Sequence, residues 1–261
     1  MILLSTFMYG TENFKDIFHY VEKYQQIGVE IFPLWHKPEF EQIMEECKER
    51  FKKIPVSYHE QYYESEHSVD NTHPLYEKTL EMLEKSLANA AELNSRFFVY
   101  HYNNMAIPAG KKDEMLQFTR NRLNKVTNRA KKLGIEVVIE NVGVTSHNNV
   151  ILNEQEFIEE CRSMPNKVLF DIGHAWANGW NLENVISSLQ DKIVAYHIHN
   201  NDGEHDLHHR ICKGTLNFDW FMELYHKYTP SADLVLEYYI DTSSDVEGIE
   251  TDIEKFLNMG F

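Results

Sequence analysis

Side chains that bind divalent metals recur along this sequence at one kind of position. Six short runs of β-branched and aromatic residues have a histidine, an aspartate or a glutamate at or next to their C-terminal end. These residues are His59, His101, Glu140, Asp171, His199 and Glu237. Imidazole nitrogens and carboxylate oxygens are the usual ligands of zinc, manganese and similar ions. Because a surface accident would not repeat in this way, the pattern predicts one metal site built from distant parts of the chain.

The segment AYHIHNNDGEHDLHH, residues 195–209, is the densest cluster of such side chains. Alternate residues of an extended strand share a face, so His197 and His199 are expected to point the same way at successive depths. His199 lies nearer the end of the run and is the better ligand candidate, whereas His197 is expected one layer deeper. The Asp-x-His pair Asp206 and His208 offers further coordination from the following loop.

Two carboxylates make the strongest physical case for a cation. Glu140 ends VVIE and Glu237 ends LVLE, so both are flanked by apolar residues. Burying an unpaired carboxylate costs several kcal/mol, and no lysine or arginine ends another run, which leaves a divalent metal as the simplest partner. In FDIGHAW, a tight turn at Gly173 is expected to return His174 over the same place as Asp171.

Eight β-rich runs alternate with eight amphipathic stretches, and these elements would position the candidate ligands. The predicted strands are residues 2–6, 28–32, 54–59, 96–101, 136–141, 167–172, 193–199 and 234–239. The predicted helices are residues 14–26, 39–52, 74–93, 113–133, 153–162, 182–189, 219–228 and 245–257. This alternation predicts a single (β/α)₈ barrel domain over residues 1–261, and the strand number disfavours an open doubly wound sheet. The C-terminal strand ends of a barrel meet at one mouth, where the six residues would converge.

Local signals mark several helix boundaries. Asn153 and Asn217 precede acidic residues and are suitable helix starts, and Gly134 follows two lysines as a helix end does. The connections 60–72 and 103–112 are long and mostly polar, so they are expected to act as mobile lids over the mouth.

Composition and charge limit the classes of partner. Hydrophobic residues make up 43% of the chain, enough for a sizeable core, and the formal net charge of −16 opposes binding to nucleic acid or an anionic membrane. The start of the chain lacks the features of a signal peptide, and no window approaches a membrane span. Three widely spaced cysteines fit a reducing compartment, so a cytoplasmic protein is expected.

These motifs together resemble the xylose isomerase-like TIM-barrel superfamily, which includes sugar isomerases, epimerases and the endonuclease-four class of AP endonucleases. The resemblance rests on the following motifs: Ile139-Glu140-Asn141, Phe170-Asp171-Ile172-Gly173-His174, His197-Ile198-His199-Asn200-Asn201-Asp202-Gly203, Asp206-Leu207-His208 and Leu236-Glu237. It implies a core metal site at Glu140, Asp171, His199 and Glu237. The sequence departs from the superfamily at Cys212-Lys213-Gly214, where a Gly-x-Gly is frequent.

The resemblance also implies roles for the remaining candidates. His59 and His101 match auxiliary positions, and His174 matches a position that faces substrate in isomerases and binds a further metal in the nucleases. Asp206 and His208 match the pair that completes the multi-metal cluster of the nucleases.

Two catalytic functions follow from one scaffold. The first is an isomerase or epimerase of a small carbohydrate, in which Glu140 and Glu237 remove and return a proton beside a carbonyl while His174 orients a substrate oxygen. Mn²⁺ is the favoured ion, and Zn²⁺, Co²⁺ and Mg²⁺ are compatible. The alternative is a multinuclear-zinc phosphodiesterase of the AP-endonuclease type. The charge of the chain disfavours it, because a DNA-binding enzyme needs a basic surface and this chain has 25 lysines and arginines against 41 acidic residues. A non-catalytic metal-storage barrel is disfavoured, since a structural site needs only four closed ligands.

Further residues are assigned to the pocket or to solvent. The candidate pocket residues are Glu30, Trp35, Trp176, His197 and Arg210. The histidines expected to be solvated are His36, His67, His73, His147, His205, His209 and His226. Nucleic acid and membranes are not expected partners, and the sequence leaves a homo-oligomer open.

Overall fold

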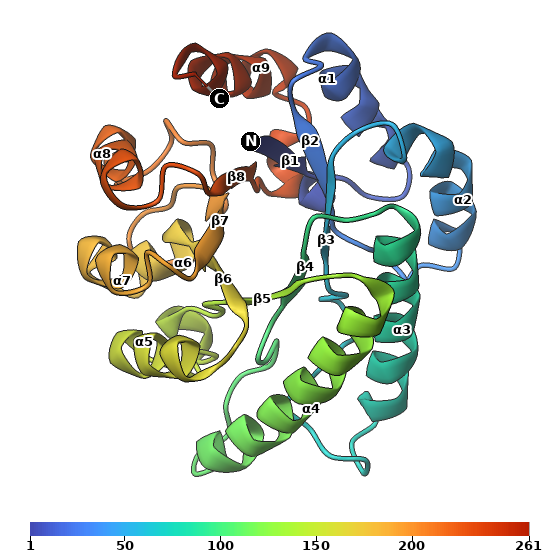
Figure 1. Ribbon diagram of the computed structural model, residues 1–261, viewed down its shortest axis with the longest axis vertical. Helices are drawn as coiled ribbons and strands as arrows, with labels where there is room; N and C mark the ends of the chain where they lie inside the picture. The colour runs from blue at the N-terminus through green and yellow to red at the C-terminus, as the bar shows by residue number, and fades with distance from the viewer. Residues whose placement is uncertain (261) are drawn as a thin grey trace.

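Eight parallel strands close into a barrel in the computed structural model, which describes residues 1–260 (Figure 1). The strands are β1 (Ile2–Ser5), β2 (Gly28–Ile31), β3 (Val56–His59), β4 (Phe98–Tyr100), β5 (Val137–Glu140), β6 (Lys167–Asp171), β7 (Ile193–Ile198) and β8 (Asp233–Leu236). β1 pairs in parallel with both β2 and β8, and the pair Leu3 and Val235 lies on the closing seam. The predicted (β/α)₈ barrel is therefore confirmed, and the open sheet is excluded.

Helices surround the barrel on the outside (Figure 1). They are α1 (Ile17–Lys23), α2 (Phe40–Phe51), α3 (Tyr76–Glu92), α4 (Lys112–Leu133), α5 (Glu154–Ser163), α6 (Ile172–Ala177), α7 (Leu182–Ser188), α8 (Phe218–Tyr228) and α9 (Val246–Asn258). Short 3₁₀ turns add η1 (Thr6–Met8), η2 (Phe14–Asp16), η3 (Thr145–His147) and η4 (Ile240–Thr242). No helix within residues 1–260 combines the length and apolarity needed to cross a bilayer.

The expected helix boundaries hold where a local cap defines them. Asn153 begins α5 through a capping box with Glu156, and the Asn217 side chain accepts a hydrogen bond from the backbone of Trp220 at the start of α8. Gly134 ends α4 in the left-handed conformation, with a φ of 78°. These signals depend only on residues a few positions apart, which is why the sequence reveals them.

Helix α6 corrects the turn expected at Gly173. The Asp171 carboxylate accepts a hydrogen bond of 2.7 Å from the backbone N–H of His174, which makes Asp171 the N-cap of a short helix that starts directly at the end of β6. His174 therefore sits in the first turn of a helix, where the cap holds its backbone in place.

An apolar plug fills the barrel below its C-terminal mouth. Its members are buried residues that face one another across the strands: Leu3, Phe97, Val99, Val138, Leu169, Ala195 and Val235. Successive residues on one face of a strand are two apart, so the next residue on the same face lies above the plug. Five plug residues are each followed, two positions later on the same face, by a polar residue: Val99 by His101, Val138 by Glu140, Leu169 by Asp171, Ala195 by His197 and Val235 by Glu237. Because side chains on one face of a strand recur every two residues, a polar layer lies directly above the apolar plug.

The two loops expected to be mobile lids are tied together. Glu66, from the β3–α3 loop, is fully buried and accepts hydrogen bonds from the backbone N–H groups of Asn104 and Met105 in the β4–α4 loop, at 2.9 and 2.7 Å. Its other oxygen accepts from the backbone and hydroxyl of Ser68. A buried carboxylate thus joins the two loops that the sequence proposed as lids.

Candidate metal centre

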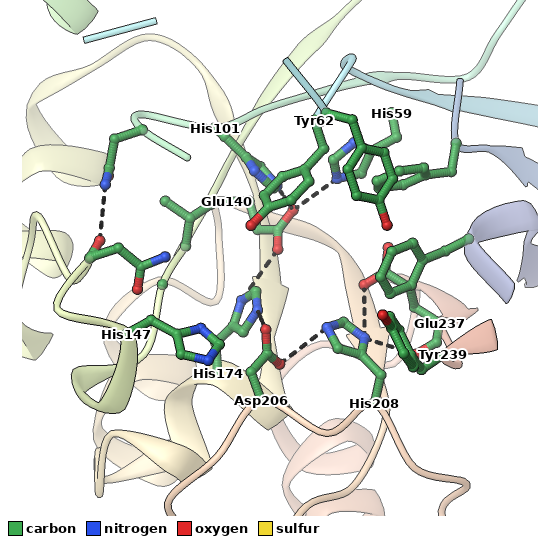
Figure 2. Close-up of a pocket in the computed structure, with 17 residues that line it drawn as sticks. His59, Tyr62, His101, Glu140, His147, His174, Asp206, His208, Glu237 and Tyr239 are labelled. Atoms are coloured by element: carbon green, nitrogen blue, oxygen red, sulfur yellow. Dashed lines mark hydrogen bonds and ion pairs between the residues drawn. The ribbon is translucent and has the colours of Figure 1, made fainter. Parts of the chain in front are cut away.

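Five imidazoles and four carboxylates meet at the C-terminal mouth of the barrel, and all of them except Asp171 and His199 are drawn in Figure 2. They come from six strand ends, from α6 and from the β7–α8 loop: His59, His101, Glu140, Asp171, His174, His199, Asp206, His208 and Glu237. They form overlapping groups, and in each group the potential ligand atoms lie within 4.8 Å of one another. The structure thus brings together every residue that the sequence proposed as a metal ligand.

The first group joins β3, β4 and β5. The Nε2 atoms of His101 and His59 lie 2.9 and 3.6 Å from the same oxygen, Oε2 of Glu140. All three side chains are buried. One carboxylate oxygen facing two imidazole nitrogens is an arrangement that a single cation between them would complete.

The central group is built around Asp171. Nε2 of His199 lies 3.1 Å from the Asp171 carboxylate, and Nδ1 of His174 lies 3.5 Å from Asp171 and 3.4 Å from Glu140. The proposed core ligands therefore fall into two overlapping sets, one with Glu140, Asp171 and His174 and one with Asp171, His199 and Glu237.

The third group uses the β7–α8 loop. The Asp206 carboxylate lies 3.3 Å from Nε2 of His174 and 3.0 Å from Nε2 of His208, and the His208 ring stacks on His199 at 3.8 Å between centroids. His208 adopts a φ of 45°, a left-handed conformation that costs about 1–2 kcal/mol for a side chain with a β-carbon. The tertiary contacts of the loop hold this strained residue in the mouth.

The departure at Cys212-Lys213-Gly214 keeps the glycine that the loop needs. A β-carbon on Gly214 would lie 2.2 Å from Oδ1 of Asn200, which accepts hydrogen bonds from the backbone of Asn201 and Leu216. The Asn200 amide also donates to the carbonyls of Ile211 and Leu216, so it organises both ends of the loop.

Two residues assigned to the pocket lie below it. His197 is fully buried, with Nε2 2.8 Å from Oε1 of Glu30 and Nδ1 3.4 Å from both Glu140 and Glu237. The hydroxyl of Ser57 donates to the other oxygen of Glu30. Neither His197 nor Glu30 lines the cavity, so the pair supports the ligand layer from beneath.

A cavity of about 270 Å³ opens above the donors. Its upper walls are aromatic, and these rings were not recognised from the sequence: Phe7, Phe32, Tyr62, Tyr63 and Tyr239. They follow strand ends, so applying the strand-end criterion to aromatic residues would have found them. None of the described residues that line the cavity is a lysine or an arginine.

Three candidate pocket residues lie outside this cavity. Nε1 of Trp35 donates to Ser86, and Nε1 of Trp176 donates to Thr215. Arg210 forms ion pairs with Asp252 at 2.7 Å and with Asp245 at 2.9 Å. Each polar group has a partner elsewhere, so these three side chains do not contribute to this cavity.

One histidine differs from the expectation of solvation, and a second is exposed as expected but borders the cavity. His67 is buried and pairs with the Glu60 carboxylate, while the exposed side chain of His147 lines the cavity. Both positions depend on loop packing, for which the sequence carries no periodic signal.

The carboxylates hold protons on most of the imidazoles. Burial opposes protonation, but Glu140 and Glu60 outweigh it at His101 and raise its pKa to about 9. Burial likewise opposes protonation of His208, where Asp206 prevails and raises the pKa to about 9. At His199 burial dominates and lowers the pKa.

The pKa values of the carboxylic acids shift in the opposite direction, downwards. Burial favours their neutral forms, yet the histidines His197 and His101 outweigh it and hold the pKa of Glu140 well below its usual value. The Asp171 pKa falls to about 2 beside His174 and His199 in spite of burial. Protonated histidines are therefore the counter-charges of the acids in the metal-free protein.

The donor set fits a divalent ion. Within residues 1–260, Oε1 of Glu237 is buried and has no hydrogen-bond partner, so one acceptor in the mouth is left for a ligand. Mixed nitrogen and oxygen donors suit Zn²⁺, Mn²⁺ or Co²⁺. Such an ion would neutralise the same carboxylates that the imidazole protons neutralise without it, so its binding would release protons.

Comparison with known proteins identifies the family. Residues 17–259 match the family described as the xylose isomerase-like TIM barrel, so the chain belongs to it. Over 101 residues the chain is 37% identical to an uncharacterized protein of Methanocaldococcus jannaschii, and this segment covers 38% of the chain and 38% of that protein.

Solved structures show the same fold. A D-tagatose 3-epimerase-like protein has a TM-score of 0.75 at 20% identity, covering 98% of this chain and 99% of that one. The IOLI protein with a bound zinc atom has a TM-score of 0.75 at 14% identity, covering 98% and 96% of the two chains.

Gly173 provides a test of how the His199 ring is placed. A β-carbon at position 173 would lie 2.0 Å from Cε1 of His199, so Gly173→Ala must push this ring away from Asp171. We expect metal affinity, measured by calorimetric titration of metal-stripped protein, to fall on the order of 10–100-fold. Gly10→Ala is the control, because its β-carbon would meet only the flexible carboxylate of Glu12. Equal affinities in both variants would refute the placement.

The histidine protons predict an unusual pH dependence for the metal-free protein. With pKa values of about 9 in the folded state against 6.5 ordinarily, His101 and His208 contribute stability that is complete below about pH 6.5. It is lost as the pH rises through 9, on the order of a few kcal/mol in total. Thermal unfolding in a chelator should show a midpoint that falls from pH 6.5 to 9, less steeply in His101→Gln. A flat profile would contradict this charge assignment.

Proposed function

We propose that this protein is a divalent-metal-dependent isomerase or epimerase of a small carbohydrate, acting by proton transfer at the carbon beside a carbonyl. One observation carries the proposal. The carboxylates of Glu140 and Glu237 both face the cavity, and both lie 3.4 Å from Nδ1 of His197. Two carboxylates beside one buried imidazole, at the ends of strands β5 and β8, are suited to act on the same bound carbon.

The side chains would divide the reaction between them. A divalent ion held by Glu140, Asp171, His199 and Glu237 would polarise a carbonyl and acidify the neighbouring C–H. Within the described chain Oε1 of Glu237 has no hydrogen-bond partner, so it can accept a proton from carbon. Glu140 would exchange the proton on the other side. Nδ1 of His174 donates to the carbonyl of Asn141, at 2.9 Å, and its Nε2, which lies 3.3 Å from Asp206, would orient a substrate oxygen together with that carboxylate.

The cavity supports an unphosphorylated sugar. Aromatic rings such as Phe7, Phe32 and Tyr62 give the C–H faces of a sugar an apolar surface. A phosphate would find no lysine or arginine among the described lining residues, and Arg210, which follows the Asp-x-His pair in the sequence, is held by Asp245 and Asp252. The aromatic walls and the paired Arg210 together favour a neutral carbohydrate.

Hydrogen exchange tests this reaction directly. The metal-loaded protein is incubated with a panel of ketoses in deuterated water, and deuterium at the carbon beside the carbonyl is followed by NMR. We expect exchange with at least one ketose, and a decrease on the order of 100-fold or more in Glu237→Gln and Glu140→Gln. Glu204→Gln, an exposed glutamate of the β7–α8 loop, is the control and should retain the rate. Equal rates in Glu237→Gln and the control would refute the assignment of Glu237.

A second candidate function is a multinuclear phosphodiesterase of the AP-endonuclease type. The observation that favours it is the number of converging donors, since one ion needs about four ligands and nine residues meet here. Several ions could activate water and stabilise a leaving oxygen. Anomalous scattering at the zinc and manganese edges, with a cleavage assay on an abasic-site duplex, separates the two. A three-ion cluster with rapid cleavage would replace the isomerase proposal.

A further inference from the structure

A second carboxylate lies behind the first ligand group. Glu60 directly follows β3, is fully buried, and has its side chain outside the cavity. The sequence interpretation placed it in a mobile lid, and it carried no assigned role. Its neighbours are the two histidines that face Glu140 and the buried His67.

Glu60 contacts both ligand histidines through different groups. Its backbone carbonyl accepts a hydrogen bond of 2.8 Å from Nδ1 of His59. Its Oε1 lies 3.8 Å from Nδ1 of His101 and accepts a hydrogen bond of 3.3 Å from the amide of Asn104. Its Oε2 accepts from Nε2 of His67.

Asn104 transmits this arrangement to the His101 ring. Nδ1 of His101 donates to Oδ1 of Asn104 at 3.0 Å, while the Asn104 amide donates to Glu60 and to the carbonyl of Ser65, at 3.2 Å. Both His59 and His101 thus use Nδ1 as a donor, so the second nitrogen of each ring, Nε2, is directed at Glu140. A hydrogen-bond acceptor at the ring nitrogen that does not bind the metal sets the tautomer and the orientation of a metal-binding histidine.

Stability alone does not account for the Glu60–His67 pair. Burying an acid and an imidazole carries a desolvation cost that apolar side chains of similar size avoid. Within residues 1–260, Nδ1 of His67 has no hydrogen-bond partner, so the pair is not fully satisfied. Glu66 already links the two loops, because it accepts hydrogen bonds from the backbone of Asn104 and Met105.

We propose that Glu60, assisted by His67 and Asn104, is the positioning residue that makes His59, His101 and Glu140 a metal-binding position in its own right. The backbone carbonyl of Glu60 aligns one ring, and its carboxylate aligns the other through Asn104. The negative charge of Glu60 also favours a cation among the three ligands. The inference rests on the proposed metal centre but is independent of the reaction at that centre.

The test is stepwise metal binding without substrate. Metal-stripped full-length protein is titrated with Zn²⁺ by calorimetry and with Co²⁺ by visible absorption. Glu60→Gln keeps the size and the backbone carbonyl but removes the negative charge and replaces one acceptor oxygen with an NH₂ donor. We expect one binding step to weaken on the order of 10–100-fold and its part of the Co²⁺ spectrum to change, while the other steps remain.

Glu66→Gln is the matched control, because Glu66 is an equally buried carboxylate of the same loop that bonds backbone groups and the Ser68 hydroxyl rather than histidines. It should lower the unfolding midpoint and leave the stepwise affinities unchanged. Unaltered binding in Glu60→Gln, or the same step lost equally in both variants, would overturn the inference.

Two further outcomes are distinguishable. If Glu60→Gln does not fold, His67→Gln keeps the Glu60 charge and removes its imidazole partner; a smaller loss in the same step supports the inference, and no loss overturns it. Absence of metal binding by the unaltered protein would refute the proposed metal centre itself. Normal wild-type binding with no defect in Glu60→Gln would refute only the role of Glu60.

Discussion

Negative charge buried at one end of a barrel is the constraint on which this structure depends. Four carboxylates gather at the mouth, and the described cavity lining brings no lysine or arginine to balance them. Imidazoles supply the balance, which is why the pKa values of His101 and His208 rise to about 9 while that of Asp171 falls to about 2. A divalent ion can replace these protons, so metal binding and protonation compete for the same carboxylates.

The rest of the fold holds this charge cluster in place. The apolar plug fills the barrel below it, and Glu30 contacts the central His197 from beneath. Glu66 joins two of the surrounding loops, while Asn200 and Gly214 shape a third. Arg210, the cation nearest in sequence to the Asp-x-His pair, is bound on the outside by Asp245 and Asp252 instead of entering the mouth.

The same donors are compatible with carbon-acid chemistry and with phosphoester hydrolysis, so the number of ions and the character of the cavity separate these functions. The shared carboxylates Glu140 and Asp171 would allow several ions to lie side by side. The aromatic walls and the acidic charge of the chain favour a neutral sugar over a polyanion. If Glu60 governs occupation of the His59–His101 position, it also governs which of the two chemistries the centre can perform.

The sequence by itself determined the barrel and its candidate metal ligands, because strand period, helix caps and polar strand ends are repeated local signals. Eight alternating units predict closure, and the polar residues at six strand ends must then face one mouth. Only the tertiary structure decided the orientation of Trp35 and Arg210, the burial of His67 and the role of Glu60 behind the ligands. Those outcomes depend on partners far apart in the chain, such as Asp252 for Arg210, and on loop packing, where competing hydrogen bonds rather than periodicity choose the side-chain direction.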